Sequence, residues 1–304
     1  MIRRLSHAVG AEIDLGEVGV DDSVARRYAE AVGASSPPAH GADLPLGLVL
    51  SLRGEPAPEV EFSNDTVSVH AGHTITLQHR LTAATRYHLT SRIAAVFEKS
   101  GRSGPLTVVT RLARLRDAQG SVAAVLEDQQ IARWRPAATP TAPAPHPAAP
   151  SVVRMPPRPT TGAGLHSGVG LDLGELIAVE HRLAPDPQAV LRYAQAFGGV
   201  EPLFVDSAFA RSIGYADVIV PGPLQAALLE HMLAAHLPNW QLHQISLTFR
   251  VSVIASEAIA LSALVIGYDA HEPRAPMVLD LALENARGEG AAVGTATLRR
   301  RYHQ

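Results

Sequence analysis

The stretch that decides the fold reads YAQAFGGVEPLFVDSAFARSIGY at residues 193–215 and VIVPGPLQAALLEHM at residues 218–232. The run from Leu224 to Leu233 is too apolar for a surface helix, so we expect a buried helix there. Strand-like stretches with β-branched residues and turn signals follow it, near residues 241–254, 256–268, 275–287 and 290–302. One buried helix followed by a curled antiparallel sheet is an α+β unit in which the sheet wraps the helix.

Two further helices are predicted before the buried one. Residues 186–198 have helical spacing and end at Gly198, as expected for a helix closed by glycine. Asp206 is then placed to cap the start of a short helix that runs through Ile213 and ends at Gly214.

The first half of the chain repeats this order. When Tyr28 is aligned with Tyr193, residues 27–37 match residues 192–202 at Arg, Tyr, both Ala, Gly and Pro. We therefore infer an internal duplication. The first half should have a helix at residues 21–33 and strands near residues 65–71, 74–81, 86–98, 105–117 and 121–133.

A segment rich in proline and alanine separates the two halves. The sequence between Arg135 and Thr160 buries little and favours extended, polyproline-like backbone. We predict an N-terminal domain at residues 1–135, a linker at 136–160 and a C-terminal domain at 161–304. Two such units in one chain would pair their sheets edge to edge as a pseudo-dimer, and further homo- or hetero-oligomers stay open.

Composition excludes several classes of function. A net charge of −3 gives no basic excess for nucleic acid, and no apolar run approaches the roughly 20 residues that cross a bilayer. We expect a soluble, cytoplasmic protein. The absence of cysteine excludes disulfides and thiolate chemistry, and we expect no cofactor and no metal.

The quoted stretch resembles the C-terminal half of MaoC-like hydratases and dehydratases, which have the hot-dog fold. SVHAGHTITLQHRL at residues 68–81 and EKSGRSGPLTVVTRL at residues 98–112 resemble the N-terminal domain of two-domain members. The resemblance implies a double hot-dog fold. It also implies the addition or removal of water at an acyl thioester carried by coenzyme A or an acyl carrier protein.

The catalytic pattern of that family is incomplete in this chain. The family has Gly-Asp-x-Asn-Pro-x-His-x-Asp, whereas residues 198–206 place Gly199 at the aspartate and Phe204 at the histidine. The equivalent residues of the first half are Ala34 and Ala39, and Pro221 stands where some two-domain relatives have a further histidine. None of these side chains can transfer a proton.

Two other residues are candidates for acid–base chemistry. Glu201 follows the lost aspartate by two residues, and a carboxylate beside an apolar wall gains a raised pKa; the alternative is a structural loop residue. His40 follows the vacant histidine position of the first half; the alternative is an exposed loop histidine. Asp206 is better explained as a helix cap.

A substrate would contact other residues of the same stretch. The N–H of Gly222, at the start of the buried helix, could bind a thioester oxygen, although a glycine between two prolines is also explained by backbone geometry. We expect the remaining wall to consist of Phe204, Gly199, Phe197 and Leu203. The repeated Tyr28 and Tyr193 indicate a structural role.

The first half also contains several histidines. His70 and His73 have opposite parity on a strand, so a shared site needs a distortion of that strand. We therefore expect His70, His73, His79 and His88 to be solvated strand residues.

Three functions stay open. The first is an enzyme with a repurposed apolar pocket that cyclises or isomerises a polyketide-like or other acyl chain. The second is a hydro-lyase with relocated groups, Glu201 and His40. The third is a non-catalytic subunit or a module that binds an acyl thioester or a released hydrophobic acyl product.

Overall fold

The computed structural model describes residues 2–5, 7–39, 42–53, 60–63, 65–101, 104–134, 172–197, 201–269, 271–272 and 274–301. His40, Gly199 and the predicted linker at residues 136–160 lie outside these residues. The domain boundaries therefore stay a prediction.

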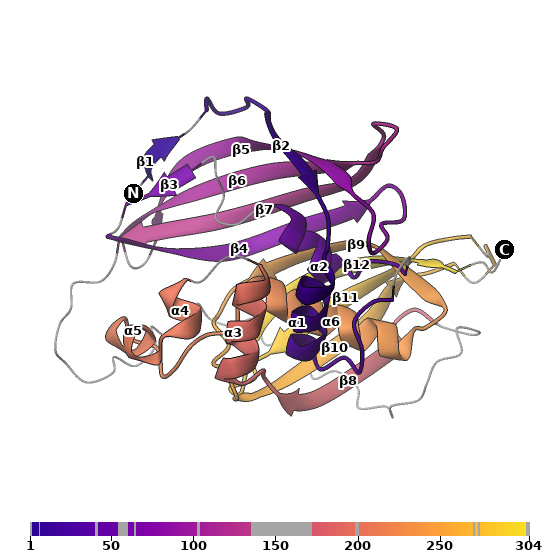
Figure 1. Ribbon diagram of the computed structural model, residues 1–304. Helices are drawn as coiled ribbons and strands as arrows, with labels where there is room; N and C mark the ends of the chain where they lie inside the picture. The colour runs from indigo at the N-terminus through magenta and orange to yellow at the C-terminus, as the bar shows by residue number, and fades with distance from the viewer. Residues whose placement is uncertain are drawn as a thin grey trace.

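A ten-stranded antiparallel sheet in the order β2-β5-β6-β7-β4-β9-β12-β11-β10-β8 forms the framework of the molecule (Figure 1). Its strands are β2 (Ile13–Val18), β4 (Thr66–Leu77), β5 (Tyr87–Gly101), β6 (Gly104–Arg116), β7 (Val122–Trp134), β8 (Leu176–Leu183), β9 (Trp240–Phe249), β10 (Ala258–Gly267), β11 (Met277–Glu284) and β12 (Gly290–Arg300). The two halves meet where β4 pairs with β9, from Gly72↔Thr248 to Thr76↔Gln244. This confirms the predicted edge-to-edge pairing.

The helix α6 (Gly222–His236) is the central helix of the second half. It contacts all five strands from β8 to β12, and also β4. Leu224, Leu228, Leu229 and Met232 are each at most 1% exposed. Such burial on successive faces explains why the sequence shows no polar side here, and it confirms the predicted buried helix.

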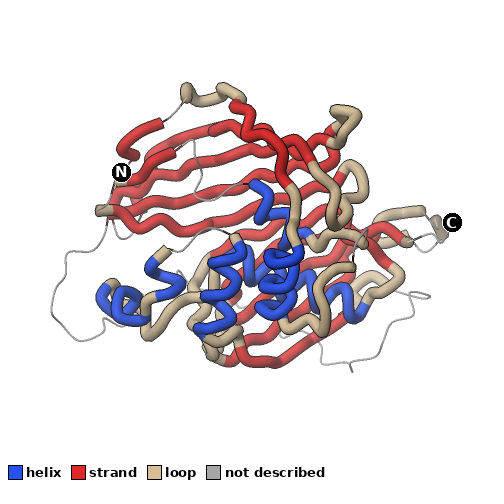
Figure 2. The backbone as a smooth tube through the Cα atoms, viewed as in Figure 1, coloured by secondary structure: helices blue, strands red, loops and turns tan. Residues whose placement is uncertain are grey.

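Four further helices pack one on the next, and the first of them also contacts α6. They are α1 (Asp22–Val32), α3 (Pro187–Ala196), α4 (Pro202–Val205) and α5 (Ser207–Ser212), and Figure 2 shows them gathered in one layer. Asp21 and Asp206 cap α1 and α5 through their carboxylates, and Gly33 closes α1 with φ of 77°. However, α3 ends at Ala196 with Phe197 as its cap, before the predicted Gly198.

The first half differs most from prediction at its centre. In place of a long buried helix it has α2 (Leu46–Val49) and one turn of 3₁₀ helix (Leu50–Arg53). A small second sheet of β1 (Ile2–Leu5) and β3 (Val60–Phe62) packs on Ile93 and Val109. Short elements thus replace the helix, and α2 packs on α6 of the second half.

The predicted strands at residues 65–71 and 74–81 are one strand, β4, with an irregular register between His70 and Gly72. The edge strands β2 and β8 were not predicted, because six- and eight-residue stretches with mixed polarity give little strand signal. Among the described residues, every helix is too short or too polar to span a membrane.

Candidate functional site

A cavity of about 100 Å³ lies where β4 of the first half faces α3, α4 and the start of α6. We call it the α3 cavity, and its walls are Leu50, Ser68, His70, Gln130, Tyr193, Ala194, Phe197, Glu201, Phe204, Pro221 and Pro223. Both halves of the chain therefore build it. Its chemistry combines an apolar wall with a histidine and a carboxylate from opposite halves.

The apolar wall comes mainly from α3 and α4. Tyr193 and Phe197 lie one turn apart on α3, so their rings stack with centroids 4.1 Å apart and planes at 22°. Phe204, at the place of the family histidine, lines the same cavity. Leu203 lies elsewhere: it is 2% exposed and packs against Val67 in a separate apolar cluster.

Glu201 occupies the N-cap position of α4, immediately before Pro202. Its side chain makes no capping hydrogen bond to that helix, whereas Asp206 accepts from the N–H groups of Ala208 (2.8 Å) and Phe209 (3.0 Å). Glu201 lines the cavity and Asp206 is engaged as a cap. The predicted cap at Asp206 is therefore confirmed, whereas the acid–base role of Glu201 stays a prediction.

His70 enters the cavity because of a bulge in β4. His70 pairs with Gln130 and Gly72 with Gln129, so Ala71 is an extra residue without its own partner. The extra residue brings His70 and His73 to the same face, with Nε2 of His70 3.1 Å from Nδ1 of His73. The expectation of separate, solvated strand histidines is therefore wrong for this pair, since His73 is only 4% exposed.

Gly222 begins α6 next to the α3 cavity. A Cβ atom at this position would lie 2.7 Å from the ring of Phe249, so a side chain is excluded by packing. That ring in turn contacts His70 and His73, with centroids 5.5 Å from each. Gly222 thus lets the start of α6 pack closely on Phe249, whose ring contacts both histidines.

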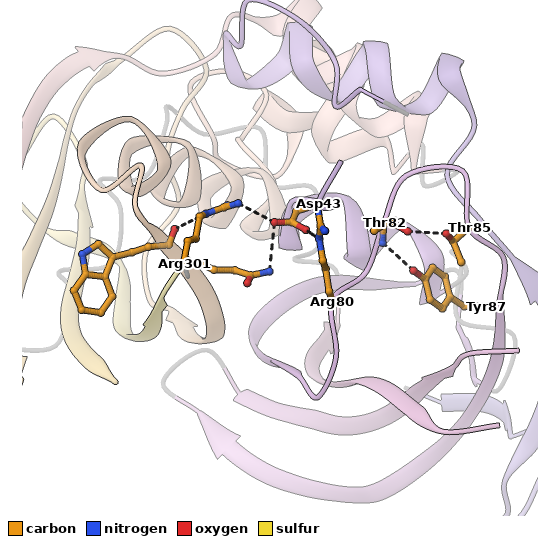
Figure 3. A network of polar contacts seen from close by, with 8 residues as sticks. Asp43, Arg80, Thr82, Thr85, Tyr87 and Arg301 are labelled. Carbon is orange, nitrogen blue, oxygen red and sulfur yellow. Dashed lines mark hydrogen bonds and ion pairs between the residues drawn. The ribbon is translucent and has the colours of Figure 1, made fainter. Parts of the chain in front are cut away.

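A second cavity of about 370 Å³ lies beside α1, and we call it the α1 cavity. Its walls are Tyr28, Ala29, Val32, Ala34, Ser36, Pro37, Pro38, Ala42, Asp43, Leu44, Pro45, Leu46, Leu77, Glu230, His231, Ala234, Gln241, Leu242 and Arg301. Asp43 closes one side: it accepts from Arg80 and, at 3.0 Å, from Arg301 (Figure 3).

Glu230 of α6 reaches into this second cavity. Its carboxylate accepts from the N–H groups of Leu46 (2.6 Å) and Gly47 (2.9 Å) and, at 3.5 Å, from the hydroxyl of Tyr28. Burial raises the pKa of Glu230 to about 7 against these hydrogen bonds, and burial next to Glu230 raises the pKa of Tyr28 well above its ordinary value.

Sequence reasoning missed His70 and Glu230. A signal for His70 existed, because an isolated glycine inside a strand pattern is typical of a bulge, and Gly72 lies beside both histidines. No local pattern marks Glu230, whose partners are 183 and 184 residues away in sequence. Within the described ranges, no group of three or more His, Asp or Glu side chains is arranged to hold a metal ion.

No protein-family model matches the sequence. The 3-hydroxyacyl-[acyl-carrier-protein] dehydratase FERN, mitochondrial, of Solanum lycopersicum is 33% identical over 91 residues, covering 30% of this chain and 54% of the relative. The mesaconyl-C(4)-CoA hydratase of Chloroflexus aurantiacus is 28% identical over 167 residues, covering 55% of this chain and 50% of the relative. The chain thus spans about half the length of these curated relatives.

Solved structures resemble nearly the whole chain. A MaoC-like dehydratase has a TM-score of 0.73 at 15% identity and covers 97% of this chain and 98% of its own. A MaoC-like dehydratase from Phytophthora capsici has a TM-score of 0.65 at 14% identity, covering 96% of this chain and 95% of its own. A conserved hypothetical protein from Mycobacterium tuberculosis with a double hot-dog fold has a TM-score of 0.60 at 13% identity, covering 97% of both chains. These likenesses confirm the predicted α+β double hot-dog fold.

Proposed function

We propose that this chain, whose double hot-dog fold is that of the MaoC-like dehydratases, adds or removes water at an acyl thioester. In this proposal His70 and Glu201 are the acid–base pair in place of the missing aspartate and histidine. The observation that carries it is that both residues, from opposite halves of the chain, line the α3 cavity.

Hydration requires a base for the attacking water and an acid for C2, so that hydroxide bonds to C3 and a proton to C2. An imidazole and a carboxylate on one cavity are suited to these two roles. A donor must also hold the thioester oxygen as enolate charge develops. Pro223 has no N–H and Leu224 donates its own to the carbonyl of Pro221 (3.0 Å), so Gly222 is the residue we assign to this oxygen.

The relatives support the substrate class. One is a 3-hydroxyacyl-[acyl-carrier-protein] dehydratase and the other a mesaconyl-C(4)-CoA hydratase, so both act on thioesters. We propose an acyl thioester of coenzyme A or an acyl carrier protein for this chain as well. A cavity of about 100 Å³ with Phe197 and Phe204 in its wall suits a short apolar acyl group.

A second candidate is cyclisation or isomerisation of a polyketide-like acyl chain. Phe204 supports it, because an aromatic ring at the place of the family histidine can hold one folded conformer of an apolar chain. This reaction needs the shape of the cavity but little proton transfer. It therefore differs from hydration in its response to removal of His70 or Glu201.

The test is turnover of the purified chain on a panel of enoyl and 3-hydroxyacyl thioesters. We expect His70→Asn and Glu201→Gln each to lower kcat on the order of 100-fold or more. His231→Asn, in the wall of the α1 cavity, is the matched control and should stay within about twofold of the wild type. His40→Ala tests the other residue proposed from the sequence.

The outcomes separate the candidate functions. Water addition that survives both substitutions would refute the assigned roles of His70 and Glu201. Conversion of a longer acyl substrate to a cyclic or isomeric product, without water addition, would favour the second candidate. If no substrate is turned over and the chain instead binds an active hot-dog protein, it is a non-catalytic subunit.

A further inference from the structure

Buried polar side chains form a row across the strands of the first half, and the row ends beside the α3 cavity. In the backbone register of the ten-stranded sheet, His73 on β4 lies opposite Asp128 on β7, and Asp128 lies opposite Arg111 on β6. Arg111 donates from Nε to Oγ of Ser91 on β5 at 2.9 Å. These side chains are 4%, 1%, 3% and 1% exposed. The row thus contains an aspartate and an arginine whose side chains are almost completely buried.

The neighbouring row on the same strands is apolar. Ile75 on β4 pairs with Leu126 on β7, which pairs with Ala113 on β6, and all three are at most 1% exposed. Apolar side chains can therefore fill equally buried positions on these strands. The polar row is therefore not needed to fill the core, and each buried charge in it requires compensation by its neighbours.

The bulge at Ala71 connects this row to the cavity. Without the extra residue, His70 would point to the opposite face of β4 from His73. With it, Nε2 of His70 lies 3.1 Å from Nδ1 of His73 and the two rings meet edge to face, with centroids 5.3 Å apart. The ring of Phe249 packs on both histidine rings and restricts their movement.

We propose that His73 is a positioning residue that fixes the ring orientation and the tautomer of His70. This inference rests on the proposed function, in which His70 transfers the proton. In their contact one nitrogen donates and the other accepts, so the proton on one ring determines the proton on the other. When His70 takes up a proton, both of its nitrogens become donors and Nδ1 of His73 accepts.

Asp128 and Arg111 complete the arrangement. Nδ1 of His73 accepts only when its proton is on Nε2, and a carboxylate at the cross-strand position favours a donor on the ring. Arg111 lies opposite Asp128 on β6 and donates to Ser91, so a positive charge stands at the cross-strand position to that carboxylate. In this proposal the Asp128 carboxylate, opposite His73 on β7, favours the His73 tautomer in which Nδ1 accepts from His70.

The first experiment does not depend on turnover. Nitrogen-15 NMR of the histidine rings reports the tautomer and protonation of His70 in the wild type, His73→Leu and His73→Asn. We expect a changed His70 tautomer in His73→Leu, and a wild-type pattern in His73→Asn because its Oδ1 can accept where Nδ1 did. An unchanged His70 spectrum in His73→Leu overturns the proposal, whether or not the chain is a hydratase.

The second experiment uses kinetics with the same variants. We expect His73→Leu to lower kcat roughly tenfold or more while KM stays within about twofold, and His73→Asn to recover most of the loss. Equal losses in the two variants would contradict the proposal. The control is Thr107→Val, which removes another buried polar group of β6, 3% exposed, outside the row. If His73→Leu does not fold, the same measurements are made on Asp128→Asn. An unchanged His70 tautomer in Asp128→Asn would then contradict the proposal.

Discussion

The α3 cavity and the α1 cavity are two versions of one site. Each lies beside a helix with tyrosine and alanine at matching places, Tyr193 and Ala194 in one and Tyr28 and Ala29 in the other. The next helix begins after a proline in both, with φ and ψ of −56° and 143° at Pro221 and −56° and 140° at Pro45. Duplication therefore extends to the local backbone.

The difference lies in what the opposite half contributes. In the α1 cavity α6 supplies Glu230, whose carboxylate takes the N–H groups of Leu46 and Gly47 at the start of α2. In the α3 cavity β4 supplies His70, and Gly222 begins the helix. An internal carboxylate thus occupies in one site the position that we assign to a thioester oxygen in the other. One fold can keep one cavity for a substrate and use its copy for internal contacts.

Filling each cavity in turn should give the largest contrast. Ala194→Leu fills the α3 cavity and should lower kcat/KM on the order of 100-fold, because a substrate is displaced from His70 and Glu201. Ala29→Leu fills the α1 cavity and should change kcat/KM less than about threefold. Each change costs roughly 1–3 kcal/mol through overpacking, which urea unfolding measures separately. Equal losses of activity would remove the functional distinction between the cavities.

The carboxyl of Glu230 should make stability depend on pH. Its pKa is about 7 in the folded chain against 4.5 as the ordinary value, so the folded chain holds an extra proton between these values. Its contribution to the free energy of unfolding is therefore largest below pH 4.5. As the pH rises to about 7, up to about 3 kcal/mol of this contribution is lost.

Glu230→Gln removes this titration. We expect the free energy of unfolding of the variant, measured in urea from pH 5 to pH 8, to fall less steeply with pH than that of the wild type. Turnover should be unaffected, since Glu230 is in the α1 cavity. A slope identical to that of the wild type would show that Glu230 titrates normally.

The two helix-start glycines should separate stability from activity. A Cβ at Gly47 would lie 2.8 Å from Tyr28 and from Ala227, so Gly47→Ala should cost about 1–2 kcal/mol and leave kcat unchanged. Gly222→Ala presses on Phe249 and should lower kcat roughly tenfold through the histidine pair. Loss of kcat in Gly47→Ala would count against the comparison.

The smallest effect is expected from the hydroxyl of Tyr28. It donates to Glu230 at 3.5 Å, the limit of a hydrogen bond, so Tyr28→Phe should change stability by less than about 0.5 kcal/mol. The hydroxyl lowers the pKa of Glu230, so its removal should move the stability transition to slightly higher pH. A shift to lower pH would contradict this arrangement.

The sequence predicted what local patterns encode. The buried helix, the cap at Asp206 and the first helix that ends at Gly33 depend on neighbouring residues, and the structure has them. The shortened centre of the first half was missed, and its contact with α6 joins residues that are far apart in the sequence. His70 was missed because one extra residue, Ala71, reverses the face of a strand.

The candidate site was predicted only in part. Phe197, Phe204 and Glu201 lie together in one cavity because they are close in sequence, whereas Leu203 faces a separate cluster. Contacts between the halves are invisible to any local pattern. The proton-transferring partner that we assign to Glu201 is such a contact.

The ion pair between Asp43 and Arg301 has a consequence for biosynthesis. These residues are 258 positions apart, and Arg301 also donates from its backbone N–H to the carbonyl of Asn239. A ribosome makes the first half before the second, so the α1 cavity acquires this wall only after Arg301 has been made. The edge of β4 likewise stays unpaired in a nascent chain until β9 has been made, so the second half protects the first half from aggregation.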